Sequence, residues 1–450
     1  MASIEKMTAG LNWETFSKAT DLQKRLLFTL GALIVYRVGT FIPLPGINAG
    51  VLNEVFARNA GGILGMFNMF TGGALSRMTL FALNIMPYIS ASIIIQLGAS
   101  VVPSLMALKK EGESGQRKMN EYTRYLTVLI TIVQGYGLAL GLEAMTGTGG
   151  VSAVIYPGWW FRFTAVVSLL GGTMFIVWLG DQITARGVGN GSSLIITAGI
   201  VAGIPVALAQ TFELGRVGQL STIVLLSVLF LALALVYIVV FVERAQRRIL
   251  IQYPKRQMGG RIMNADSTHL PLKINPTGVI PPIFASSLLL LPMTIVNITA
   301  NNGQGTEWVV TLSQILAHGQ PVYLTLYALL IVFFTFFYTA VVFNPEETAD
   351  NLKKQGGFIA GIRPGKSTAD YLDYVITRLT VLGAAYLAAL CCLPEILMAK
   401  FSIPFILGGT TLMIVVSVTM EFATQIQSHL LAHQYEGLMK KAAKLKGRRK

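Results

Sequence analysis

The sequence predicts an all-α polytopic membrane protein with ten transmembrane helices in two pseudo-inverted halves of five. Hydrophobic residues make up 53% of the 450 residues and charged residues only 12%, whereas soluble domains carry about 25% charged residues. The apolar residues gather in runs close to the length of roughly 20 that a helix needs to cross a bilayer. Basic residues are concentrated in alternate loops, as the positive-inside rule requires of a multi-pass protein.

Ten apolar runs are the candidate spanning helices. They are too long and too uniformly apolar for barrel strands, in which apolar and polar residues alternate. The fifth and ninth runs are short, so we expect flanking residues to extend them. In chain order the runs are residues 26–42, 78–102, 125–142, 163–179, 194–208, 220–242, 278–296, 322–343, 379–393 and 403–420.

The distribution of Lys and Arg predicts the orientation. Of these 35 residues, 29 fall in the two tails and the loops on one side, 4 fall in the loops on the other side, and Arg37 and Arg162 lie in or beside spans. This asymmetry predicts that both termini are cytoplasmic. The first 25 residues lack the apolar core of a cleavable signal, so we expect the protein to insert through its own spans.

The ten spans suggest a division of the chain into four parts. They are a cytoplasmic N-tail (1–25), a first half (26–219), a second half (220–420) and a basic cytoplasmic C-tail (421–450). The second half contains long cytoplasmic loops at about 243–277 and 344–378. Because five is odd, the second half would enter the membrane inverted, and such repeats place functional sites between the halves. The halves show no strong sequence similarity, so this division rests on topology.

The predicted spans are nearly free of ionisable side chains. Enzymes and ion-coupled transporters usually place such groups near mid-membrane. Arg37, in the outer half of the first span, is the clearest exception, and we expect it to snorkel or to pair with a neighbour. Glu143 and Asp181 fall at span ends.

Two residue pairs resemble ligand sites but have simpler interpretations. Cys391 and Cys392 are adjacent in an apolar run and are interpreted as small apolar fillers. His429 and His433 lie one helical turn apart in a polar tail and are interpreted as a solvated helix face. We therefore predict no metal site.

Two glycine clusters also have simpler interpretations. Residues 361–367 resemble a phosphate-binding loop, but Ala360 stands where that motif needs glycine, and we expect neither the preceding strand nor the following helix. Residues 187–191 join the fourth and fifth spans and predict a tight turn.

Residues 63–75 form an apolar segment that is too short to span. Runs of 10–14 residues are more often re-entrant or interfacial. Gly72 and Gly73 separate this one from the second span. A half-helix of this kind must lie inside protein or line a cavity, because lipid does not tolerate broken backbone. The segment therefore indicates a pathway through the molecule.

The two long loops carry clustered positive charge and leave two interpretations open. They could be orientation signals that contact lipid headgroups. They could equally form a docking surface for a large acidic partner, such as ribosomal RNA or an acidic protein. The candidate docking residues are Arg247, Arg248, Lys255, Arg256, Lys353, Lys354, Arg363 and Lys366.

Six motifs, taken together, resemble the SecY family, whose members are channel subunits of the bacterial protein-translocation complex. The resemblance runs from about residue 26 to residue 450 and is greatest to Gram-negative bacterial members. The motifs are FNMFTGGALSR (67–77), IMPYISASIIIQ (85–96), KKEGESG (109–115), STHLPLK (267–273), GVIPPIF (278–284) and FNPEETADNLKK (343–354).

The resemblance implies a channel without enzymatic activity or cofactors. Its two halves would surround an hourglass pore in the bacterial inner membrane. The pore would pass unfolded secretory polypeptides and release membrane-protein segments laterally. The implied partners are the small SecE and SecG subunits, the SecA motor ATPase, a translating ribosome, signal peptides, nascent chains and anionic lipids.

The resemblance also implies roles for individual residues. The apolar pore ring would comprise Ile85, Ile89, Ser192, Ile196, Ile283 and Ile414, although Ser192 departs from the isoleucine usual at its position. The plug, at about residues 63–77, would include Ile63, Leu64, Met66, Phe67, Asn68, Met69, Phe70, Thr71 and Leu75. Ser90 and Leu291 would line a lateral gate formed by spans two and three facing spans seven and eight. Arg363 matches an arginine in a loop that partners touch.

The physical chemistry of the task agrees with this implication. A polypeptide carries every kind of side chain, so its pore cannot select by charge. A narrow apolar constriction passes a chain yet excludes ions, because water leaves it. A secondary transporter would instead need a polar site at mid-membrane, and an enzyme would need a convergent acid, base or metal set; neither pattern stands out in the spans.

Overall fold

The structure, a computed structural model, describes residues 19–58, 68, 71–145, 151–216, 221–253, 257–258, 261–262, 267–289, 320–401 and 408–447. Helices dominate this part of the chain, as predicted. They are α3 (Thr20–Gly39), α4 (Ala49–Arg58), α6 (Met86–Val101), α7 (Pro103–Lys110), α8 (Glu113–Ala144), α9 (Trp159–Arg186), α10 (Gly191–Arg216), α11 (Thr222–Arg244), α14 (Pro321–Val342), α15 (Pro345–Lys354), α16 (Lys366–Phe401) and α17 (Gly409–Gly447). The strands are β1 (Gln246–Gln252), β2 (Gln257–Met258), β3 (Arg261–Ile262), β4 (Ser267–Lys273) and β5 (Phe358–Ile359).

Six helices in the described ranges are long and apolar enough to cross a membrane, and α6 with α7 makes a seventh if this pair, bent by 100°, is one span. Large apolar side chains cover the outside of several of them; on α11, for example, Ile223 is 80% exposed and Phe230 is 74% exposed. Such a surface requires lipid rather than water around it. The fold is therefore a polytopic helical membrane protein, and the full count of ten spans stays a prediction.

Several threonines inside the spanning helices satisfy their hydroxyl groups within their own helix. In α14, Thr335 donates to the carbonyl of Ile331 at 2.6 Å and Thr339 to that of Thr335 at 2.8 Å. Thr131 of α8 does the same to Thr127 at 2.7 Å. Because each donor finds a carbonyl four residues back, these polar residues remain compatible with an apolar environment.

The predicted start of the second span, residue 78, is wrong. A series of turns occupies residues 71–85, here named the connector, and α6 begins only at Met86. Met78 (φ +45°) and Asn84 (φ +49°) adopt the left-handed conformation, which a right-handed helix cannot contain. Pro87 then stands in the first turn of α6, where its missing N–H has no cost.

Several helices extend past their predicted spans, α16 and α17 furthest among them. Helix α16 begins at Lys366 rather than near residue 379, and α17 crosses the predicted boundary at residue 420 without a break. Inside α16, beyond the predicted end at residue 393, Glu395 is only 3% exposed. The spanning helix α16 is thus longer than the predicted run and contains a buried carboxyl group, which the expectation of spans nearly free of ionisable groups did not include.

The context expected for residues 361–367 is also corrected. A strand of two residues, β5, precedes the segment, and α16 opens at Lys366. Both elements were expected to be absent. The strand is far shorter than the buried strand of a phosphate-binding loop, and Ala360 still occupies the glycine position.

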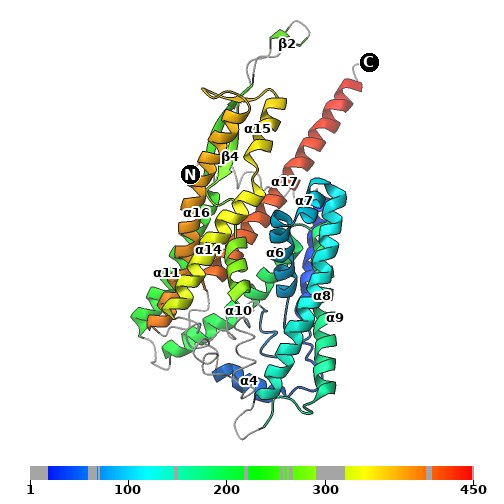
Figure 1. The fold of residues 1–450 in the computed structure, drawn as a ribbon, viewed down its shortest axis with the longest axis vertical. Coiled ribbons are helices and arrows are strands. Elements are labelled where there is room, and N and C mark those ends of the chain that lie inside the picture. The colour runs from blue at the N-terminus through cyan, green and yellow to red at the C-terminus, as the bar shows by residue number, and fades with distance from the viewer. Residues whose placement is uncertain are drawn as a thin grey trace.

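A small antiparallel sheet joins the two long loops in the order β4–β1–β5. Strand β1 pairs with β4 from Gln246↔Lys273 to Gln252↔Ser267, and with β5 at Ile251↔Ile359. Ile249, Leu272 and Ile359 pack under it against α16. The sheet, α15 and the C-terminal end of α17 lie at one end of the molecule, here named the sheet end, and α4 lies at the other (Figure 1).

Candidate pore and plug region

Five isoleucines of the predicted ring belong to one contiguous group of apolar side chains, here named the ring cluster. Ile85, at the end of the connector, is fully buried, and Ile196 of α10 and Ile414 of α17 are 6% and 1% exposed. Ile89 of α6 and Ile283 of the helix Ile280–Leu289 are partly buried and pack against the same cluster. Tyr36, Phe81, Ile176 and Ile200 are among its other members. The fold thus brings together side chains from four segments that are far apart in the sequence.

The sixth predicted position, Ser192, lies near the start of α10 against α9. Its Oγ is 3.6 Å from the point where a Cβ on Gly180 would stand. Its backbone N–H donates to Asn190 Oδ1 at 3.1 Å, so that Asn190 satisfies an otherwise free donor of the first helical turn. A Cβ on Gly191 would overlap the carbonyl oxygen of Gly180, so this close crossing of α9 and α10 requires glycine.

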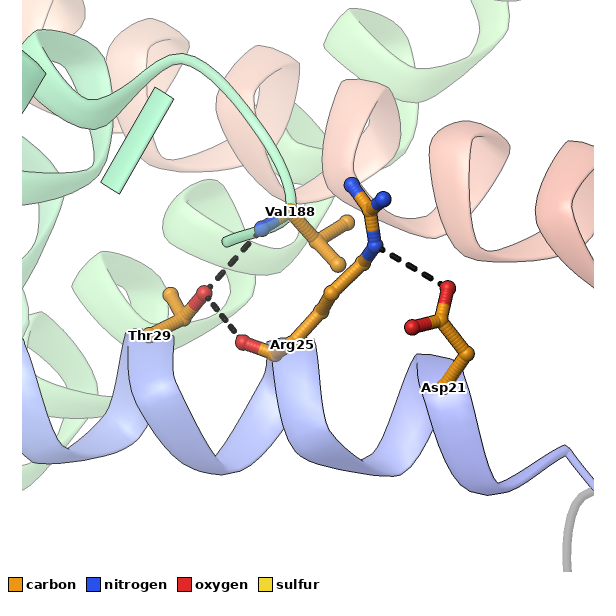
Figure 2. A network of polar contacts seen from close by, with 4 residues as sticks. All are labelled: Asp21, Arg25, Thr29 and Val188. Atoms are coloured by element: carbon orange, nitrogen blue, oxygen red, sulfur yellow. Dashed lines mark hydrogen bonds and ion pairs between the residues drawn. The ribbon is translucent and has the colours of Figure 1, made fainter. Parts of the chain in front are cut away.

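A buried threonine of α3 fixes the turn that precedes α10 (Figure 2). Thr29 is 3% exposed, and its hydroxyl accepts the N–H of Val188 at 3.1 Å while it donates to the carbonyl of Arg25 at 2.9 Å. Arg25 pairs with Asp21 at 3.3 Å on the exposed side. The predicted tight turn at residues 187–191 is confirmed, since α9 ends at Arg186 and α10 begins at Gly191. Through this turn, α3 sets the position of Ile196.

The same turn is held from a second side. Val188 packs with Leu22 of α3 and Leu430 of α17, and Phe422 of α17 lies against this group. Gly189 (φ +93°) has the ring of Phe422 at 3.3 Å from its Cβ position. The long helix α17 therefore contacts both the ring cluster, through Ile414, and the turn that leads into α10.

The described part of the predicted plug is a compact loop that ends in the connector. Asn68 closes this loop: its Oδ1 accepts the N–H of Ser76 at 2.7 Å, and its carbonyl accepts from Gly73 at 2.8 Å and from the Thr71 hydroxyl at 3.0 Å. Thr71 and Leu75 are buried. The other named plug residues lie outside the described residues: Ile63, Leu64, Met66, Phe67, Met69 and Phe70.

Arg37 contacts this region directly, which confirms that it pairs with a neighbour. Its Nη1 donates to the carbonyl of Gly72 at 2.8 Å. Its guanidinium lies over the ring of Phe41, 5.0 Å from the centroid, and the guanidinium of Arg77 lies 4.3 Å from the same centroid. The sequence identified Arg37 as a charged residue inside a span. It contained no signal for its partner Gly72, which is 35 residues away.

One of the two predicted gate positions lies in α6. Ser90 lies in α6 and is 6% exposed, and Leu291 lies outside the described residues. Helix α6 packs against two apolar groups. Ile85, directly before α6, belongs to the ring cluster. Ile93, within α6, belongs to a second cluster together with Phe284 and with Ile331 of α14. We name this group the second-half cluster.

The basic residues of the two long loops gather at the sheet end. Arg247 and Arg248 are exposed on β1, and the pairing of β1 with β5 brings the second loop beside them. The candidate docking residues of that second loop are all exposed: Lys353, Lys354, Arg363 and Lys366. Lys255 and Arg256 lie outside the described residues.

An acidic pocket, which sequence reasoning missed, lies beside these cations. It has a volume of about 540 Å³ between the start of α15 and the start of α16. Glu346, Asp350, Asp370 and Asp373 line it, together with Lys366. Acidic residues near helix starts were the available signal, since they favour the positive end of the helix dipole.

No group of three or more His, Cys, Asp or Glu side chains in the described ranges is arranged to hold a metal ion. Cys391 is buried and Cys392 is half-buried, and both are free thiols.

Comparison with known proteins agrees with this arrangement. The model of the SecY family matches residues 79–423. The protein translocase subunit SecY of Escherichia coli strain K12 is 57% identical over 427 residues, which cover 95% of this chain and 96% of that protein.

Two solved structures share the fold at low sequence identity. One is a structure of a SecY protein whose plug domain is described as stabilising the closed state of the translocation channel and maintaining a membrane seal. It has a TM-score of 0.63 and 18% identity, and the match covers 91% of this chain and 92% of that one. The other is Sec61 in the canine ribosome–channel complex, with a TM-score of 0.62, 17% identity and the same coverage.

Proposed function

Because this chain belongs to the SecY family, we infer that it is the channel subunit of a bacterial inner-membrane protein translocase. It is a channel and not an enzyme. It passes unfolded secretory polypeptides across the membrane and releases membrane-protein segments sideways into the lipid. In the proposed architecture, ten spans form two pseudo-inverted halves around an hourglass pore, with both termini cytoplasmic.

The observation that carries the mechanism is the ring cluster. Isoleucines from four segments meet in one apolar group, as a constriction that excludes ions requires. Water leaves a narrow apolar neck, and ions cannot follow without their hydration shells. Branched aliphatic side chains can then pack around a translocating chain of any sequence, because they offer no charge that would bind or repel it.

Residues 63–75 are proposed as a plug that closes the channel on the outer side. The compact loop around Asn68 joins them to the connector, and the connector ends at Ile85 in the ring cluster. Movement of the plug would therefore be coupled to the ring. The plug domain described for the related SecY structure supports this role.

The lateral gate is proposed at the seam along α6, with Ser90 and Leu291 as lining residues. Ile85, directly before α6, and Ile93, in the middle of α6, belong to different apolar clusters. Separation of the two clusters would expose the face between them to lipid. A sufficiently apolar segment in the pore would then leave for the bilayer, which favours it by about 25 cal/mol for each Å² of apolar surface removed from water.

The sheet end is proposed as the cytoplasmic docking surface. Exposed cations, including Arg247, Arg248 and Arg363, lie there on two loops that the pairing of β1 with β5 joins. The ribosome is one proposed partner, which the related ribosome-bound Sec61 complex supports. The other proposed partners are the SecA motor, SecE and SecG, signal peptides, nascent chains and anionic lipids.

Reconstitution in vesicles tests the proposed function. The protein is combined with the small subunits, the motor, ATP and a precursor that carries a signal sequence, and the protease-protected precursor is measured. We expect protection that depends on ATP and on the signal. The absence of protection, together with uptake of a radiolabelled small solute, would instead indicate a secondary transporter.

A further inference from the structure

We propose that Arg37 is a gating residue whose guanidinium pins the connector between α3 and α10 and so holds the ring cluster closed. This inference rests on the proposed function of the ring cluster as the seal. It gives a role to the charged side chain that stands out within the first span.

The pinned point is Gly72, whose carbonyl oxygen accepts the hydrogen bond from Arg37 Nη1 at 2.8 Å. On the side of α10, a Cβ added to Gly72 would stand 2.9 Å from the carbonyl oxygen of Gly199 and 3.0 Å from its Cα. Gly72 also has a φ of +64°, which glycine adopts readily. The connector backbone is therefore pressed onto α10, three residues beyond Ile196, and Arg37 secures it from α3.

Arg37 is oriented for this bond by its neighbours. It stands in the last turn of α3, with its guanidinium over the ring of Phe41 and with Nη1 3.4 Å from Thr40 Oγ1. Stacking on an aromatic face restricts the planar guanidinium to a few orientations. The guanidinium is thus preorganised to donate to the carbonyl of Gly72. A charged donor makes a hydrogen bond roughly twice as strong as a neutral one.

The connector links the pinned point to the ring. Met78 and Asn84 are 0% and 2% exposed and both hold left-handed backbone conformations. Such conformations are unfavourable for residues with a Cβ and persist only where the surroundings impose them. Ile85 follows directly and is buried in the ring cluster. Loss of the hydrogen bond from Arg37 to Gly72 removes one of the contacts that hold the connector in this conformation. The position of Ile85 in the ring cluster is then less strongly fixed.

Arg37→Met tests the proposal, with Arg77→Met as the matched control. Methionine keeps an unbranched apolar side chain but removes the charge and the donors. Arg77 stacks on the same Phe41 ring, whereas the bond to Gly72 comes from Arg37. Each protein is reconstituted at an equal amount of inserted chain, and resting ion conductance and precursor translocation are measured.

We expect Arg37→Met to raise the resting conductance about 10-fold or more, the change in equilibrium that corresponds to one lost hydrogen bond to a charged group. It should also translocate precursors with impaired signals. Arg37→Lys, which keeps a charged donor, should fall between Arg37→Met and the wild type, and Arg77→Met should stay close to the wild type.

Gly72→Ala tests the same contact from its other side without a change in charge. Its added Cβ meets Gly199, so the variant should also leak. The double variant should leak no more than the leakier single one, because one contact can be lost only once. A tight Arg37→Met channel, an equal leak from Arg77→Met, or additive leaks would each overturn the gating role. If the wild type itself fails to translocate, the proposed function is wrong; a translocating wild type with a tight Arg37→Met variant refutes only the gating role.

Discussion

Asparagine in place of Ile89 or Ile283 should wet the ring cluster and raise the resting ion conductance. Both side chains are partly buried against that cluster, and Ile89 also packs against the second-half cluster. Ile89 therefore lies where the two apolar groups meet, and Ile283 lies at the ring cluster. Asparagine brings two donors and an acceptor that aliphatic neighbours cannot satisfy.

The magnitude follows from the difference between the closed and open states. An amide without partners in an apolar environment costs about 2–7 kcal/mol. In the closed cluster the neighbours are aliphatic and aromatic side chains, so most of this cost falls on the closed state. In an open, hydrated pore the amide bonds to water and the cost disappears. Even about 1.4 kcal/mol of this difference would raise the ratio of open to closed channels roughly tenfold.

The assay is ion conductance in vesicles, normalised to the amount of correctly inserted protein. Ile238 of α11 provides the matched control, because it is 45% exposed on a helix that faces outward. Ile238→Asn should reduce insertion without a leak, since its amide meets lipid instead of a pore. If Asn at Ile89 and Ile283, singly and together, leaves the conductance of inserted protein unchanged, the ring is wrongly placed.

Four further predictions concern other parts of the molecule. Thr29→Val should lower the free energy of unfolding by about 1–3 kcal/mol, because the buried N–H of Val188 loses its acceptor; Thr29→Ser keeps the hydroxyl, and thermal unfolding in detergent should show a smaller loss. Arg363→Glu should weaken motor or ribosome binding and translocation at unchanged abundance, and binding should fall with salt, since exposed charges are screened within about 10 Å at 0.1 M; binding that ignores both changes would leave these cations as orientation signals. Deletion of residues 63–75 should leave a folded channel that leaks small ions, and an equally tight membrane would point to a purely structural segment. Reporter fusions after Lys118 and Lys354 should read cytoplasmic and one at Thr148 external, and a cytoplasmic signal from Thr148 would contradict the topology.

Properties set by local composition could be predicted from the sequence. Apolar runs indicated the spanning helices α8, α9, α11, α14, α16 and α17, because lipid requires apolar side chains whatever their neighbours are. The glycines at residues 187–191 indicated the turn between α9 and α10. The start of α6 could not be predicted in this way, since the left-handed conformations of Met78 and Asn84 occur in an apolar segment that reads locally as helix.

Long-range partnerships were decided only by the tertiary structure. The pairing of β1 with β5 joins residues more than 100 positions apart, and Arg37 meets Gly72 across 35 residues. An isoleucine that seals a pore has the same chemistry as one that faces lipid, so resemblance to a family, rather than periodicity, was needed to select Ile85, Ile196 and Ile414. The sequence by itself therefore determined which segments enter the membrane, because solvation acts on each segment separately. The fold decided which side chains meet, because packing is a property of pairs.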